Sequence, residues 1–244
     1  MGKYLRVAAV IVLTGITGCK PRTPTTDSSL ASPAQQITAL EAKASKGDST
    51  AQCDLGLCYF RGEGVRKDAA QAVQWYRKAA EQGNAKAQDY LAACYYAGIG
   101  AEKDTDAALM WLRKAADGGN ANAQGSLGAC YYFGKGAERN VTEAVKWFRK
   151  AAEQGHAMSQ TCLGTCYVRG SGVTQDVAEG VTWFRKAAEQ GDAMGQANLG
   201  LCYAKGIGVT KDSAEAEALF RKAAVKGSAE VQAVIDSANS NGGR

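Results

Sequence analysis

The sequence repeats with a period of 36 residues, and this period constrains the fold more than any other feature. Periods of roughly 20–50 residues are typical of solenoids, in which each unit buries its apolar face against its neighbours. A solenoid offers an extended surface rather than an enclosed pocket, so the period favours a binding protein. A Cys-Tyr pair marks each of the five copies, at Cys58, Cys94, Cys130, Cys166 and Cys202.

Each copy is predicted to form two helices, termed A and B, separated by a glycine turn. In the first copy, small and apolar residues recur at helical spacing from Ala51 to Tyr59. Gly62 is expected to end the A helix in a left-handed turn. Asp68 is a favoured N-cap for the B helix, which stops at Gly83. The equivalent caps in the other copies are Asp104, Asn140, Asp176 and Asp212.

The repeated motif resembles the Sel-one-like repeat (SLR) family, which is related to tetratricopeptide repeats. Its core reads Ala-Gln-x-x-Leu-Gly-x-x-Tyr, then Gly-x-Gly-Val, Lys-Asp and Ala-Val-x-Trp-Tyr-Arg-Lys-Ala-Ala-Glu-Gln-Gly. The resemblance covers about 39–238. It implies an all-α fold, a right-handed α/α superhelical solenoid of five helix-turn-helix repeats that scaffolds protein complexes. Some cysteine-rich secreted members of the family bind or hydrolyse β-lactams.

The register of the motif predicts the organisation of the chain. A capping helix is expected over 37–48, and a second capping helix with a tail over 229–244. Terminal units of a solenoid are expected to differ from the internal ones because they lack one stacking neighbour. The five full repeats occupy 49–84, 85–120, 121–156, 157–192 and 193–228.

Residues 1–18 resemble a bacterial lipoprotein signal peptide. Two basic residues precede a ten-residue apolar stretch over 7–16, and Cys19 follows shortly after. The resemblance implies lipidation of Cys19, and an ordinary signal peptide is the alternative. The Pro/Thr/Ser-rich segment over 19–36 is then expected to tether the repeats to the bacterial cell envelope, facing the periplasm. Lys20 favours the outer membrane under the family rule for lipoprotein sorting.

Differences among the copies indicate a binding surface. Six positions of the A helix scarcely change, whereas four others vary and lie on the opposite side of the helix. These four positions form the variable stripe: Thr50, Asp54, Leu57, Arg61, Lys86, Tyr90, Ala93, Ala97, Asn122, Ser126, Ala129, Phe133, Met158, Cys162, Thr165, Arg169, Met194, Asn198, Leu201 and Lys205.

In superhelices of this family the A helices line the concave face, so the variable stripe is the expected groove for a protein or peptide partner. The alternative is that these are simply tolerated surface residues. The expected apolar anchors and charged contacts are Tyr90, Phe133, Met158, Arg61, Arg169 and Lys205.

Seven cysteines remain after Cys19, so they cannot all pair. Equivalent helices of neighbouring repeats lie about 8–10 Å apart, beyond the roughly 7 Å between Cα atoms that a disulfide allows. Tetrahedral zinc needs four clustered ligands, and one cysteine per repeat with the single His156 cannot supply them. Buried packing thiols are therefore favoured over disulfides and over a metal site.

Little in the sequence indicates catalysis. It contains no His-Glu-x-x-His, Ser-x-x-Lys, Ser-Asp-Asn or Lys-Thr-Gly motif, and no cofactor is expected. Without the signal peptide the net charge falls from +5 to +3, because two of the 29 basic residues are lost, and this is too mild to indicate nucleic acid. The sequence thus predicts a non-enzymatic, membrane-tethered scaffold. One alternative is a binder of peptidoglycan fragments or β-lactams with weak β-lactamase-like activity, and another is a spacer with no specific ligand.

Overall fold

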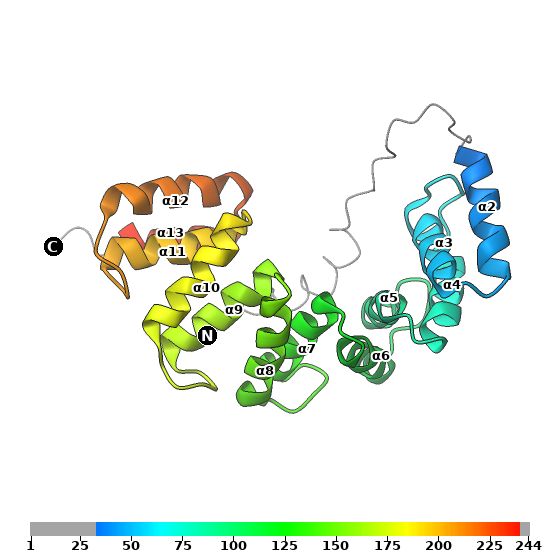
Figure 1. Cartoon of the computed structure of the whole chain (residues 1–244), viewed down its shortest axis with the longest axis horizontal. Helices are drawn as coiled ribbons and strands as arrows, with labels where there is room; N and C mark the ends of the chain where they lie inside the picture. The colour runs from blue at the N-terminus through cyan, green and yellow to red at the C-terminus, as the bar shows by residue number, and fades with distance from the viewer. Residues whose placement is uncertain (1–32, 240–244) are drawn as a thin grey trace. The chain divides into compact units, whose positions relative to one another are not determined.

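The computed structural model describes residues 33–239 (Figure 1). The predicted signal peptide, Cys19 and most of the tether lie outside these residues. Within 33–239 all regular secondary structure is helical, as predicted. The helices are α2 (Pro33–Ser45), α3 (Ser49–Arg61), α4 (Ala69–Glu81), α5 (Ala85–Ala97), α6 (Thr105–Asp117), α7 (Ala121–Phe133), α8 (Val141–Glu153), α9 (Ala157–Arg169), α10 (Val177–Glu189), α11 (Ala193–Lys205), α12 (Ser213–Lys226) and α13 (Ala229–Asn239).

The described helices belong to two compact units, residues 33–127 and 128–239. In the first unit, α3 packs on α2 and α4, and α5 packs on α4 and α6. In the second unit, α9 packs on α8 and α10, and α11 packs on α10, α12 and α13. Each repeat is therefore a helical hairpin whose A helix also contacts the preceding B helix. This confirms the predicted α/α repeat architecture.

The predicted helix caps are confirmed. Gly62 has a left-handed backbone, with φ of 77°, and its N–H donates to the carbonyl of Cys58. Only glycine adopts this conformation without strain, so the turn stops the A helix. The Asp68 carboxylate then accepts a hydrogen bond from the N–H of Gln71 and begins α4. Side chains at the same position cap the later B helices: Asp104, Asn140, Asp176 and Asp212.

A glycine of the A helix lies against an aromatic ring of the B helix in four of the five repeats. A Cβ built on Gly128 would come 2.7 Å from the Phe148 ring, closer than real carbon atoms approach. The second repeat instead has Ala92 and Leu112 at these two positions, so a larger A-helix residue accompanies a smaller B-helix residue. The other glycine–aromatic pairs are Gly56–Tyr76, Gly164–Phe184 and Gly200–Phe220.

The first helix starts earlier than the sequence predicted. We expected a tether up to residue 36 and a capping helix over 37–48, but α2 spans Pro33–Ser45. Proline is favoured in the first turn of a helix, where its missing N–H would have no partner. The proline that appeared to belong to the tether therefore begins the helix.

The two terminal helices are polar where further repeats would pack. Helix α2 takes the place of a B helix, but it has exposed Gln36 and Lys43 at the positions of the fully buried Ala72 and Ala79. Helix α13 takes the place of an A helix, and it packs on α11 and α12. It has an exposed Asp236 at the position that holds a buried glycine in four repeats. Both helices thus cap the core of their own unit.

The core of the first unit contains a carboxyl group that the sequence analysis did not identify. Asp89 on α5 is only 7% exposed, and this burial raises the pKa of its side chain to about 7 because desolvation disfavours the charged form. The other repeats have small uncharged residues at this position: Cys53, Gly125, Thr161 and Ala197.

We expect Gly128→Ala to lower the free energy of unfolding by about 1–3 kcal/mol, because the added methyl group overpacks the contact with Phe148. Adding Phe148→Leu should recover part of this loss, since the pair then matches Ala92 and Leu112. Urea denaturation of both single variants and the double variant measures the coupling. Strictly additive losses would contradict the steric explanation.

We expect Asp89→Asn to stabilise the protein more at pH 8 than at pH 5. The pKa of Asp89 is about 7 in the folded chain, whereas the unfolded chain releases the proton near the ordinary aspartate pKa of 3.8. The free energy of unfolding of the wild type therefore falls as the pH rises between these values. Denaturation midpoints of both proteins at the two pH values test this, and an equal difference at pH 5 and pH 8 would exclude it.

Candidate functional site

One buried hydrogen bond recurs at every junction between repeats. The amide of Gln52 on α3 donates to the carbonyl of Ala44 in α2, over 3.0 Å. The same carbonyl also accepts the backbone N–H of the glycine three residues later, as Ala44 does from Gly47 over 3.1 Å. The glutamine therefore occupies the second acceptor position of this oxygen and ties the next A helix to the end of the preceding helix. This explains why the glutamine scarcely varies between repeats. The equivalent bonds are Gln88 to Ala80, Gln124 to Ala116, Gln160 to Ala152 and Gln196 to Ala188.

Each B helix contains an Arg-Lys doublet, which is Arg77-Lys78 in the first repeat. Several of these side chains contact aromatic residues. The guanidinium of Arg77 donates to the hydroxyl of Tyr95 in the next repeat, over 2.5 Å, and the Lys78 ammonium lies 4.1 Å from the centre of the Trp75 ring. Arg149 and Arg185 make the same type of contact with Tyr167 and Tyr203. The doublets are mostly exposed. Their arginines contact the next repeat, whereas their lysines lie over a tryptophan of the same helix.

The variable stripe is not uniformly accessible. Arg169 and Lys205 are exposed, Phe133 and Met158 are half-buried, and Arg61 is half-buried at the end of α3. Each A helix contributes four stripe positions. The first and last of these keep accessible surface in every repeat, whereas the two middle positions are buried in the second and third repeats. Of the six predicted contact residues, five therefore retain some accessible surface.

Tyr90 is the exception, and its predicted role as a surface anchor is wrong. Its side chain is 2% exposed and belongs to the core formed by α4 and α5. The ring centre lies 5.2 Å from that of Tyr76, in a tilted arrangement. The sequence pattern could not distinguish this residue, because a position that varies between repeats can vary to suit the local packing as well as a partner.

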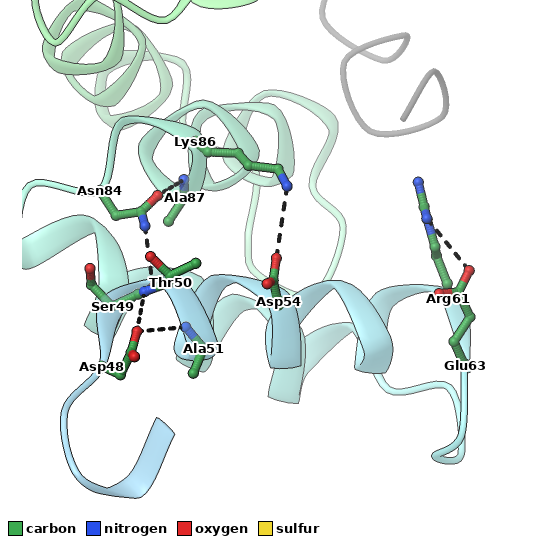
Figure 2. A network of polar contacts seen from close by, with 10 residues as sticks. All are labelled: Asp48, Ser49, Thr50, Ala51, Asp54, Arg61, Glu63, Asn84, Lys86 and Ala87. Atoms are coloured by element: carbon green, nitrogen blue, oxygen red, sulfur yellow. Dashed lines mark hydrogen bonds and ion pairs between the residues drawn. The ribbon is translucent and has the colours of Figure 1, made fainter. Parts of the chain in front are cut away.

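The variable stripe of the first unit is internally neutralised. Figure 2 shows the Lys86 side chain crossing from α5 to Asp54 on α3, where the two charged groups are 3.8 Å apart. At the end of α3, Arg61 pairs with Glu63 over 3.5 Å. Such exposed pairs contribute little stability. Their effect here is to leave this part of the stripe without excess charge.

In the second unit, Phe133 and Arg169 both lie close to Tyr132. The rings of Phe133 and Tyr132 meet edge to face at 5.0 Å. Burial raises the pKa of Tyr132, and the positive charge of Arg169 opposes this shift. These two predicted contact residues therefore belong to one region at the C-terminal ends of α7 and α9. Met158 is in the first turn of α9, at the other end of that helix.

One cluster resembles the components of a hydrolase, but its geometry does not allow nucleophilic attack. The Nδ1 atom of His156 lies 2.7 Å from the hydroxyl of Ser159. Burial lowers the pKa of His156, and the nearby Asp192 opposes this shift. Ser159 is only 1% exposed, so a substrate has no access to its oxygen. Asp192 caps α11 and accepts a hydrogen bond from Thr161.

The seven cysteines within 33–239 form no disulfide with one another, and four of them are buried in the core. Burial raises the pKa of Cys94 and Cys162 to about 12 and that of Cys166 and Cys202 to about 11. A thiol with such a high pKa is almost entirely protonated at neutral pH and is therefore a poor nucleophile.

Two further features of the described residues bear on function. No three His, Cys, Asp or Glu side chains among them lie close enough to hold a metal ion. None of the helices of this part of the chain is long and apolar enough to cross a membrane.

Comparison with known proteins gives the same repeats. The solved structure of a Sel1 repeat protein of Oxalobacter formigenes is similar, with 35% identity and a TM-score of 0.77 over 91% of this chain and 84% of the other. A protective antigen of uropathogenic Escherichia coli strains, which has an SLR fold, is also similar, with 36% identity and a TM-score of 0.75 over 93% of this chain. This chain spans about half of the E. coli chain, 47% of its length.

A Sel1 repeat protein of Klebsiella pneumoniae shares the fold at 19% identity, with a TM-score of 0.51, over 85% of this chain and 100% of the other. Comparison with curated proteins finds no match. The Sel1 repeat profile matches all five repeats, over 49–84, 85–120, 121–156, 157–192 and 193–228. The chain belongs to the Sel1 repeat family, whose helical repeats are typical of scaffolds for protein–protein interaction.

Proposed function

We propose that this protein is a scaffold that binds a protein partner through the variable stripe. The observation that carries the proposal is the contrast between two sets of A-helix positions. The invariant set makes the contacts that build the repeat, including the junction bond of Gln52. The variable set differs from repeat to repeat on the same backbone. Apart from its buried positions in the second and third repeats, its side chains are accessible and can suit a partner without altering the fold.

A preformed surface favours such binding. Helices α3, α5 and α11 are capped at both ends, as at Asp48 and Gly62 of α3, so this part of the stripe is ordered before a partner arrives. Binding to an ordered surface avoids the entropic cost of fixing loops. The exposed stripe residues of the second unit mix apolar and cationic groups, which is typical of protein interfaces, where aromatic residues, Met and Arg are enriched.

We further propose that the scaffold is lipid-anchored at Cys19 in the bacterial cell envelope, with the repeats facing the periplasm. The support is the sequence of residues 1–18, with its basic start, apolar stretch and following cysteine. A single acyl chain gives only marginal membrane binding, and a lipoprotein-type cysteine with several chains would give stable attachment. The outer membrane is the favoured location because of Lys20.

A photo-cross-linking amino acid at Met158 or Lys205 is expected to capture one partner in intact cells, because these side chains lie on accessible parts of the stripe. Matched controls carry the same amino acid at Gln74 and Lys146, which are exposed on B helices. Mass spectrometry of the adducts is the readout. Equal capture of the same protein from the control positions, or none from the stripe, would contradict the proposal.

We expect Cys19→Ala to move the protein from the membrane fraction to the soluble periplasmic fraction, because the variant lacks the thiol that accepts the lipid. Detergent phase partitioning and intact-mass measurement of both proteins check this. Cys58→Ala is the control, since it removes a thiol within the repeats. An unlipidated wild-type protein would refute the anchor while leaving the binding proposal intact.

A further inference from the structure

The ends of the A helices in the second unit carry an excess of positive charge. Residues 133–140, 169–176 and 205–212, which contain these ends and the following turns, hold five basic and three acidic residues. The corresponding residues of the first unit, 61–68 and 97–104, hold four of each. The five basic residues are termed the basic edge: Lys135, Arg139, Arg169, Lys205 and Lys211.

The three turns of the basic edge lie side by side. A Cβ built on Gly172 would come 2.6 Å from the backbone oxygen of Val141, the first residue of α8. A Cβ built on Gly208 would come 2.7 Å from the side chain of Val177, the first residue of α10. Each turn therefore rests on the start of the preceding B helix, next to the turn of the preceding repeat. The basic residues of successive repeats form one continuous edge.

Arg169 and Lys205 on this edge are accessible and are not neutralised. Both are exposed, and neither takes part in an ion pair with any residue of the described part of the chain. The equivalent Arg61 of the first unit is paired with Glu63. The later repeats have no acidic residue at the position of Glu63.

Three acidic residues lie among the five basic ones, so the edge keeps an excess of two positive charges. Two of the three are helix caps, as Asp68 and Asp104 are in the first unit. The carboxylates of Asp176 and Asp212 accept hydrogen bonds from the first N–H groups of α10 and α12. The partial positive charge at a helix N-terminus opposes the negative charge of such a cap. Glu138 is the remaining acidic residue, and it stands next to Arg139 in sequence.

An aromatic pair lies among the cations. Arg139 Nε donates to the backbone carbonyl of Tyr132 over 3.2 Å, and the Tyr132 and Phe133 rings meet edge to face at 5.0 Å. Phe133 is half-buried and keeps some accessible surface, whereas Ile207 packs against the core of the second unit. A contact made only of charges would not use the accessible part of Phe133. An extended peptide has side chains that can fill both kinds of position.

We propose that the basic edge binds an acidic peptide segment of the protein partner, with Glu or Asp side chains interspersed with aromatic or aliphatic ones. This inference rests on the proposed function of the variable stripe, of which Phe133, Arg169 and Lys205 are members. Complementary charge would steer the segment to the second unit and exclude basic segments. The neutral stripe of the first unit would contact a different part of the partner.

The probes are two fluorescein-labelled twelve-residue peptides, one built from Glu, Phe and Ser and the other with every Glu replaced by Lys. Fluorescence anisotropy with the full chain should show binding of the Glu peptide alone, weakening as the salt concentration rises from 50 to 300 mM, because ions screen exposed charges. The variant Arg169→Gln/Lys205→Gln should bind at least about tenfold more weakly. The matched control, Arg66→Gln/Lys103→Gln, makes the same change in net charge at exposed turn residues of the first unit that lie outside the variable stripe, and it should bind within twofold of the wild type.

Equal weakening by both double variants would overturn the proposal, since only the overall charge would then matter. Equal binding of the Lys peptide, or no binding of the Glu peptide, would also overturn it. Binding of the chain to phosphatidylglycerol vesicles, lost in Arg169→Gln/Lys205→Gln and without any peptide binding, would assign the edge to a membrane instead. The cross-linking experiment separates the two proposals. If Arg169→Gln/Lys205→Gln still captures the partner at Met158, the basic edge is rejected and the binding stripe is not. If the wild type captures no partner at any stripe position, the proposed function itself is rejected.

Discussion

The hydrogen bond between the invariant glutamine and the preceding B helix is the interaction on which the stacking of repeats depends. A buried glutamine amide without a hydrogen-bond partner would be costly, and a carbonyl oxygen can accept two hydrogen bonds. In each repeat the glutamine amide donates to a carbonyl at the end of the preceding helix that also accepts a backbone N–H, as Ala152 accepts from Gln160 and from Gly155. In two repeats the same glutamine also accepts a bond from a second glutamine, as Gln160 does from Gln190 over 2.7 Å. Each junction is therefore polar at its centre and apolar around it.

The glycine–aromatic contact sets the distance between the two helices of a repeat. Because Gly128 has no side chain, α8 can place the Phe148 ring directly against the backbone of α7. The second repeat satisfies the same constraint with Ala92 and Leu112. The pairs Gly128–Phe148 and Ala92–Leu112 differ in residue type but have about the same combined side-chain volume. A close-packed core requires the volume to be conserved rather than the residue type. The residue at such an A-helix position thus depends on the residue that it contacts on the B helix.

Much of the fold could be predicted from the sequence, whereas the site could be predicted only in outline. Periodicity and capping chemistry act locally, so Gly62 and Asp68 could be assigned without knowledge of any tertiary contact. The burial of Tyr90 depends on the neighbouring Tyr76, and the burial of Asp89 depends on the surrounding helices. Neither is visible in the 36-residue pattern. The basic edge was missed for a related reason, because Lys135, Arg139 and Lys211 lie in turns, outside the helical positions that define the stripe.

The polar residues on the terminal helices determine how chains of this protein can associate. A solenoid whose end helices were as apolar as its internal ones could stack on the next molecule and grow without limit. Stacking on α2 would bury the Lys43 ammonium, and stacking on α13 would bury the Asp236 carboxylate, which accepts a hydrogen bond only from the neutral amide of Gln232 among the described bonds. Head-to-tail fibres are disfavoured for that reason.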